Sequence, residues 1–337
     1  MDILIKHNKI IGGITLAALM IVAQGCESDF DPDINDKPVV VVNMLAQPGN
    51  KLSASITHSW SHTDNSFPDV KIADATVRYS INGHRTGVMI YNPVTGQYET
   101  EYTPEVGDDI EISVKSDIYG SVSGRTYVPE QVKIDKWSFN PVEVTDYNGI
   151  VSGDTLSYLR RLNIEYSITF SDPAGEENYY MISGRQYHDT GGGFSSDPII
   201  SENNTPMDAI FSKNSTFVVF SDRSIDGRTY TLRYTCSYTP FIPVTDFAER
   251  LTDRIALCSI SRDYYLYLLS IYKKYGDLNH NLEDLGLTEP KIIYSNVTDG
   301  AGIVAAQSSD TIVNDVHDIV CRFIGIDPDY PFFEQPE

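Results

Sequence analysis

The sequence has little of what catalytic and nucleic-acid-binding proteins require. It carries 25 basic residues against 47 acidic ones, which gives a formal net charge of −22. That charge repels nucleic-acid phosphates and argues against binding anionic lipid by charge. Neither a G-x-S-x-G nucleophile elbow nor an H-E-x-x-H zinc motif occurs. With only two tryptophans, the chain does not favour a flat sugar-binding platform either. We therefore predict a protein that is not an enzyme.

Cysteine is also scarce, and no C-x-x-C pair indicates a zinc or redox site. Cys26 belongs to an N-terminal signal described below, which leaves three other cysteines. An exported protein can oxidise its thiols, and three cysteines allow three pairings between which the sequence does not choose. We take Cys236 and Cys258 as a candidate disulfide, with Cys321 buried and free.

The N-terminus carries the clearest signal in the chain. Lys6 and Lys9 form a short basic start before an apolar run at 10–22, and small residues around one glutamine lead to Cys26. A basic start, an apolar core of about 7–15 residues and a small-residue exit are typical of a secretory signal peptide. The run is shorter than the ~20 residues that a membrane-spanning helix needs. We predict a lipoprotein signal peptide at 1–25 and lipidation of Cys26, the alternative being a plain signal peptide in which this cysteine is incidental.

Lipidation would determine where the protein resides. Each buried CH₂ of an acyl chain such as palmitate contributes about 0.8 kcal/mol, so several chains hold a protein firmly on a membrane. The segment 26–36 is acidic and rich in turn formers, which predicts a solvated tether. An acidic segment directly after a lipidated cysteine also resembles the surface-export signal of Bacteroidota lipoproteins. We expect the protein on the outer membrane, facing the cell exterior.

Short strand patterns separated by turn residues fill the region 37–130. The segment 52–58 alternates apolar and polar residues, the period expected of a half-buried strand. Asn82-Gly83 is a strong hairpin signal, because both turn residues must accept positive φ. About seven strands at spacings of roughly 8–12 residues predict an immunoglobulin-like β-sandwich.

Residues 131–337 predict a second, β-rich domain with longer strands and larger loops. The main α-helix is expected at 262–275, where apolar side chains fall on one stripe and Ser261 is placed to cap the first turn. The segment 318–324 predicts a strand. A loop at 188–208 contains three consecutive glycines, and loops of that length in compact domains are usually functional or mobile.

Two sets of residues are candidate metal or modification sites. After the main helix, residues with side-chain oxygens that can bind a metal occupy every second position, a spacing similar to the start of a calcium loop. They are Asp277, Asn279, Asn281 and Glu283. Leu282 stands where such a loop requires glycine, so a plain polar loop is the alternative. Two short patterns match those used for O-glycosylation of exported Bacteroidota proteins and predict modification of Thr155 and Thr311. No cofactor besides calcium is expected.

Several motifs resemble a known family. They are A-D-A-T-V at 73–77, G-Q-Y at 96–98, R-T-Y-V-P at 125–129, S-I-S-R-D-Y-Y-L-Y-L at 259–268 and D-G-A-G-I at 299–303. Together they resemble the Bacteroidota lipoproteins of the domain-of-unknown-function group four-two-four-nine, over most of the mature chain. Such proteins are encoded beside TonB-dependent outer-membrane receptors. The resemblance thus implies a surface accessory lipoprotein with such a receptor as its partner, and it implies no catalytic residues.

Three functions remain open at this point. The first is a non-catalytic lipoprotein that captures ligand for, or caps, a TonB-dependent nutrient-uptake receptor. The second is a structural or adhesive surface protein such as a fimbrial anchor, which an exposed edge strand that accepts a partner's strand would indicate. The third is a surface hydrolase, although nothing singles out a catalytic pair among the 47 acidic residues. We favour the first.

Overall fold

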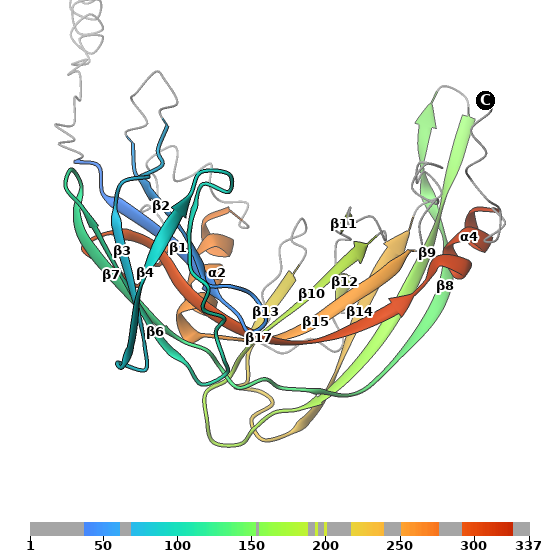
Figure 1. The fold of residues 1–337 in the computed structure, drawn as a ribbon. Coiled ribbons are helices and arrows are strands. Elements are labelled where there is room, and N and C mark those ends of the chain that lie inside the picture. The colour runs from blue at the N-terminus through green and yellow to red at the C-terminus, as the bar shows by residue number, and fades with distance from the viewer. Residues whose placement is uncertain are drawn as a thin grey trace, which may run out of the picture. The chain divides into compact units, whose positions relative to one another are not determined.

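A computed structural model of the chain (Figure 1) describes residues 37–60, 69–152, 155–187, 193–194, 199–200, 217–238, 251–275 and 292–325. From Pro38 onward the chain forms one compact unit. This unit is mainly β, as predicted. Neither of the helices described is long and apolar enough to cross a membrane.

Seven strands follow one another in the N-terminal part of the chain, as the turn spacing predicts. They are β1 (Val40–Ala46), β2 (Ser53–His58), β3 (Thr76–Ile81), β4 (Arg85–Asn92), β5 (Gln97–Glu99), β6 (Asp109–Ser116) and β7 (Gly120–Tyr127). The β3–β4 hairpin turns at Asn82 and Gly83, whose φ angles of 54° and 70° are both positive. The hairpin signal is therefore confirmed, because these residues adopt the backbone conformation that such a turn requires.

The remaining strands and the two described helices lie beyond residue 130. The strands are β8 (Ile134–Ser152), β9 (Thr155–Ser171), β10 (Tyr179–Tyr187), β11 (Gly193–Phe194), β12 (Ile199–Ile200), β13 (Phe217–Ser221), β14 (Thr229–Tyr238), β15 (Thr252–Ile260), β16 (Val297–Thr298) and β17 (Ala301–Asp315). The helices are α2 (Arg262–Tyr275) and α4 (His317–Ile324). A 13-stranded sheet has the order β11-β10-β15-β17-β1-β2-β5-β4-β3-β6-β7-β16, with β13 on β10, and a 4-stranded sheet has the order β12-β14-β9-β8.

Strand β17 connects the two parts of the chain within the larger sheet (Figure 1). Its first residues pair in parallel with β1, with Val42 opposite Gly302, and residues 307–315 pair with β15. Gly302 has a φ of 100°, and a Cβ there would lie 2.1 Å from the carbonyl oxygen of Val42, so the contact requires glycine. The expected boundary near residue 130 thus divides two regions that share a strand. The immunoglobulin-like topology stays a prediction.

Buried side chains form one cluster beneath the N-terminal strands, the N-terminal core. Most of its members are aliphatic residues from β1 to β7, such as Val40, Ile56 and Ile110. Val297 and Val304, from the far end of the sequence, belong to the same cluster. The N-terminal strands therefore complete their hydrophobic core with residues from β16 and β17.

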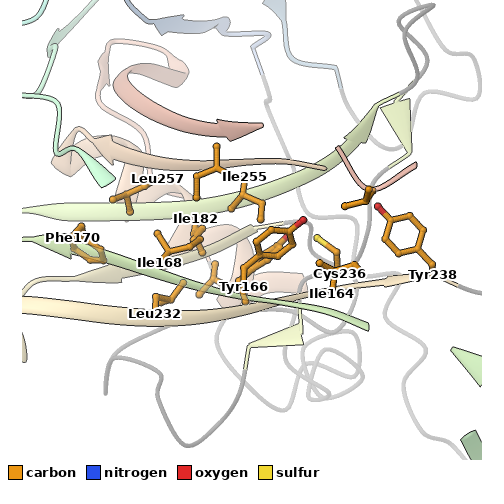
Figure 2. Packing of buried hydrophobic residues seen from close by; sticks show 14 of the residues in the cluster. Ile164, Tyr166, Ile168, Phe170, Ile182, Leu232, Cys236, Tyr238, Ile255 and Leu257 are labelled. Carbon is orange, nitrogen blue, oxygen red and sulfur yellow. The ribbon is translucent and has the colours of Figure 1, made fainter. Parts of the chain in front are cut away.

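A second cluster, the second core, packs the smaller sheet against β10 and β15 of the larger one. Figure 2 shows its close-packed side chains, among them Tyr166 and Phe170 of β9, Leu232 of β14, and Ile255 of β15. This cluster is rich in aromatic rings, and the ring centroids of Phe170 and Tyr180 lie 5.4 Å apart. A third, smaller cluster lies under α2 and includes Met181, Cys258 and Leu268.

Helix α2 has the predicted bounds and the predicted cap. The backbone N–H of Tyr264 donates to Ser261 Oγ at 3.4 Å, as expected of an N-cap. Ser261 also attaches the helix to β17, because its N–H donates to the Ala306 carbonyl at 2.9 Å and its Oγ accepts the Ala306 N–H at 3.2 Å. The same serine therefore fixes both the start of the helix and its position on the sheet.

The prediction of a strand at 318–324 is wrong, because this segment forms helix α4. Its buried residues His317, Val320 and Cys321 recur with the spacing of one helical face. Gly325 ends the helix in the left-handed conformation, with a φ of 83°. In so short an apolar segment the pattern fits either structure, and packing of this face against the second core accounts for the helix.

Candidate ligand-binding surface

The sheet formed by β4, β3, β6 and β7 has one side on the N-terminal core and the other in solvent. Side chains alternate between the two sides along each strand. On β3, Val77 is buried whereas Thr76 and Arg78 are exposed. On β6 and β7 the same alternation places four polar residues on the solvent side: Ser113, Lys115, Ser121 and Ser123.

Three adjoining hollows on this solvent side form what we call the sheet-face groove. One hollow, of about 570 Å³, is lined by Thr76, Arg78, Ser113, Val114, Lys115, Ser121, Val122, Ser123 and Asp299. A second, of about 470 Å³, shares Arg78 and Ser113 with the first and includes Val88. A third, of about 550 Å³, shares Val88 and reaches Lys51. The groove runs from β5 across β4, β3 and β6 to β7, a span of roughly 19 Å at ~4.8 Å per strand spacing.

Two cations lie next to each other in this groove. Arg78 is opposite Ser113 and Thr76 is opposite Lys115 in the β3–β6 ladder, so Arg78 and Lys115 are diagonal neighbours on one side of the sheet. Within the described part of the chain, neither side chain makes a hydrogen bond or an ion pair. The two positive charges therefore face solvent together and repel each other.

A third cation on the same side of the sheet is neutralised. Arg125 on β7 pairs with Asp109 on β6 through two hydrogen bonds, one from Nε to Oδ1 at 2.6 Å. The hydrogen bonds from Arg125 lower the pKa of the Asp109 carboxyl, against a smaller opposing effect of burial. The contrast singles out Arg78 and Lys115 as the cations of this surface that are open to a ligand.

Three carboxylates form a separate acidic cluster at one end of the second core. Asp172, Asp222 and Asp226 have oxygens within 4.8 Å of one another. Each accepts a backbone N–H: Asp172 from Gly227 at 2.9 Å, Asp222 from Asn178 at 2.6 Å, and Asp226 from Gly175 at 2.9 Å. The hydroxyl of Tyr180 also donates to Asp172. These bonds tie the turn after β9 to the turn after β13, which explains the cluster as a structural clasp.

The environment of this clasp disfavours ionisation. Burial raises the pKa of Asp172, and the neighbouring Asp222 and Asp226 carboxylates add to the rise, while hydrogen bonds from Tyr180 and Gly227 oppose it. The pKa of Asp222 is raised for the same main reason, burial. Sequence reasoning missed this cluster, because Asp172 lies about 50 residues before Asp222 and Asp226 and each one alone is an ordinary turn aspartate.

A buried carboxyl also contacts tyrosines of the second core. Asp253 is fully buried and accepts hydrogen bonds from the hydroxyls of Tyr166, at 2.6 Å, and Tyr238. Asn314 on β17 donates to the Tyr166 hydroxyl at 2.8 Å. Burial raises the pKa of Asp253, although the two tyrosines oppose the rise. This hydrogen-bond network joins β9, β14, β15 and β17, and we interpret its role as structural.

The predicted Cys236–Cys258 disulfide is not formed, and both cysteines are buried thiols. Cys236 lies in the second core, whereas Cys258 lies in the cluster under α2. Asp253, Ile255 and Leu257 of β15 face the second core, so Cys258 points to the opposite side of the sheet. Burial raises the pKa of the Cys258 thiol to about 12. Cys321 is buried and free, as predicted.

Most other predicted site residues lie outside the described residues. These are Cys26, the candidate calcium ligands Asp277, Asn279, Asn281 and Glu283, and most of the loop 188–208. Thr155 is the first residue of β9, and Thr311 is exposed on β17. Lipidation, calcium binding and glycosylation at these positions stay predictions.

Fold and surface together define a mainly β protein whose candidate ligand site is a polar groove on an open sheet face. Residues 27–312 match the family described as Domain of unknown function (DUF4249). The chain therefore belongs to that family, as the sequence motifs indicate. A search of curated proteins gives no match.

Proposed function

We propose that this protein is a non-catalytic, lipid-anchored protein of the outer-membrane surface that captures a ligand for, or caps, a TonB-dependent nutrient-uptake receptor. The observation that carries the proposal is the sheet-face groove, because its lining offers hydrogen-bond donors on a rigid sheet. Arg78, Lys115 and the hydroxyls around them suit recognition of a ligand. The lipoprotein signal ending at Cys26 and the family resemblance support the location and the partner.

Affinity purification from detergent-solubilised outer membranes tests the partnership. The tagged full-length protein serves as bait, and mass spectrometry identifies what is retained. Recovery of a β-barrel receptor would support the proposal, and its consistent absence would contradict it. A Cys26→Ala bait is the matched control, because it should be misprocessed or released from the membrane and should retain no receptor. Unchanged membrane association of this variant would overturn the lipid anchor.

A structural or adhesive role is the second candidate, and strand β8 favours it. β8 is an edge strand of the smaller sheet and pairs with β9 alone among the described strands. Trp137 and Phe139 on it are stacked, with centroids 6.2 Å apart, and remain 39% and 38% exposed. An edge strand of this kind suits addition of a partner's strand.

Size measurement separates this second candidate from the first. A Trp137→Glu variant places a charge on the exposed ring site without touching the sheet-face groove. Under the adhesive role, assemblies seen by light scattering or electron microscopy for the unmodified protein should disappear in the variant. Under the receptor role, the variant should still retain the receptor in the purification described above.

A further inference from the structure

One hollow of the sheet-face groove surrounds Arg78 and Lys115. Three properties make it more than a solvated strand face: its two neighbouring cations, its free hydroxyls, and its single carboxylate, Asp299. Each of these properties restricts the chemistry of a ligand in a different way.

The cations require an anionic group. Arg78 and Lys115 are diagonal neighbours in a chain whose formal net charge is −22, and neither has an ion-pair partner among the described residues. Bringing an anion between them removes their mutual repulsion and adds charge-assisted hydrogen bonds. The planar guanidinium of Arg78 matches the two oxygens of a carboxylate or a sulfate.

The hydroxyls provide short, neutral hydrogen-bonding groups beside the cations. Thr76, Ser113, Ser121 and Ser123 line the same hollow, and none of their hydroxyls is bonded to a described residue. Hydroxyl groups both donate and accept hydrogen bonds, so they match the hydroxyls of a polyhydroxylated ligand. A bare inorganic anion would leave most of them unused.

Asp299 excludes ligands that are anionic throughout. It lies in the turn between β16 and β17, is exposed, and contributes to the same hollow. A carboxylate accepts hydrogen bonds and repels other anions. A run of acidic residues in a peptide would therefore meet this repulsion, whereas the hydroxyls of a sugar would find an acceptor.

We propose that this hollow binds an acidic saccharide, with the anionic group of one sugar unit between Arg78 and Lys115 and neighbouring hydroxyls on Asp299 and the serines. The shared chemistry is an anionic group on a polyhydroxylated ring, whether carboxylate or sulfate. The adjoining hollows over β3 and β4 extend the site for further units. The inference deepens the ligand-capture part of the proposed function but does not depend on the receptor.

Calorimetry on the full mature chain in detergent tests the proposal. The probe is a trisaccharide with one uronic acid unit and two neutral units, and its methyl ester keeps the hydroxyls but removes the charge. We expect saturable binding of the acid, at least about tenfold weaker binding of the ester, and weakening with added salt. A sulfated trisaccharide distinguishes the two anionic groups, and inorganic sulfate and tetraglutamate report binding of charge alone. Preference for tetraglutamate over the sugars would overturn the proposal.

Variants locate the site. Arg78→Gln with Lys115→Gln should weaken binding of the acidic trisaccharide at least about tenfold while leaving the melting temperature unchanged, because both side chains are exposed. Arg223→Gln with Lys136→Gln is the matched control, since it removes the same two charges from exposed positions outside the groove. Asp299→Asn should weaken binding of the sugar but not of inorganic sulfate.

Two results would overturn the proposal. One is the absence of saturable binding of every acidic saccharide, and the other is equal binding by the groove variant and its matched control. Neither result bears on whether a receptor is retained in the membrane purification. Conversely, loss of the receptor partnership would leave sugar binding intact, so the failure of each proposal is recognisable by itself.

Discussion

The two hydrophobic cores are built from different side chains. The N-terminal core is mostly valine, isoleucine and methionine, and the one buried carboxyl among its described residues, Asp108, lies in a turn at its margin. The second core contains several buried aromatic rings, and two of its tyrosines donate to the fully buried carboxyl of Asp253. One region is therefore held by non-directional packing, and the other adds hydrogen bonds that demand a fixed geometry.

This difference explains where the tyrosines of the chain are used. The sequence has 22 of them, which at first suggests surfaces for stacking a ligand. Three of them, Tyr166, Tyr180 and Tyr234, are fully buried instead. Tyr166 and Tyr180 donate hydrogen bonds to carboxyls. The aromatic residues mainly stabilise the second core, while the candidate binding surface lies over the aliphatic one. Variants that weaken one core at a time test this division.

The largest effect is expected where the two regions share a strand. Gly302→Ala places a Cβ against the Val42 carbonyl and should destabilise the fold by about 3–5 kcal/mol, since the parallel β1–β17 ladder must shift. Gly49→Ala is the control, because its φ is also positive, at 88°, but nothing lies within 4 Å of the new Cβ. It should cost about 1 kcal/mol. Urea unfolding measures both, and equal losses would mean that the regions are not coupled through β17.

The next effect compares one buried carboxyl from each core, Asp253 and Asp108. Asp253→Ala leaves the hydroxyls of Tyr166 and Tyr238 without an acceptor deep in the core, and should cost about 3–5 kcal/mol. Asp108→Ala removes an acceptor from Tyr102 and the Glu105 N–H in a turn at the margin of the N-terminal core, where we expect water to replace it, and should cost about 1–2 kcal/mol. Thermal unfolding gives the order, and the reverse order would contradict a central role for the Asp253 network.

The smallest effect concerns pH and has opposite signs in the two regions. The folded pKa of Asp109 is lowered by Arg125, so its stabilising contribution is present above the unfolded value of about 3.9 and is lost as pH falls through the folded pKa. The folded pKa of Asp172 is raised by burial, so its contribution is present below about 3.9 and is lost as pH rises through the folded pKa.

Asparagine variants isolate these two contributions. The stability deficit of Asp109→Asn should grow between pH 3 and pH 7, whereas that of Asp172→Asn should shrink as the pH rises from about 4. Chemical unfolding at a series of pH values measures both deficits. Parallel curves for the two variants would show that burial does not determine how the stability contribution of Asp172 depends on pH.

Local features of this fold were predictable from sequence, because they depend on residues close together in the chain. The hairpin at Asn82 and Gly83 and the helix beginning after Ser261 follow from turn and capping chemistry. The parallel pairing of β1 with β17 leaves no local trace, since parallel strands far apart in sequence carry the same apolar pattern as other buried strands. For the same reason, the predicted division near residue 130 did not anticipate a shared strand.

The candidate site was hidden for a related reason. Arg78, Ser113 and Lys115 each occupy an ordinary solvent-facing position on a strand, and only the β3–β6 register makes them neighbours. The disulfide prediction failed because the sequence does not state on which side of β15 Cys258 lies. The side of the sheet on which a residue lies and the register between strands both depend on how the whole sheet is assembled. Local sequence patterns do not determine them.

The parallel pairing of β1 and β17 also determines how the protein bears mechanical load. A pull on the chain end before β1, resisted by the second core through β15, draws two parallel strands from opposite ends. Force in that direction shears the contacts between residues 41–46 and 301–306 all at once instead of opening them one by one. A protein held by its N-terminal end thus meets the applied force first at the β1–β17 ladder, whose hydrogen bonds resist it together.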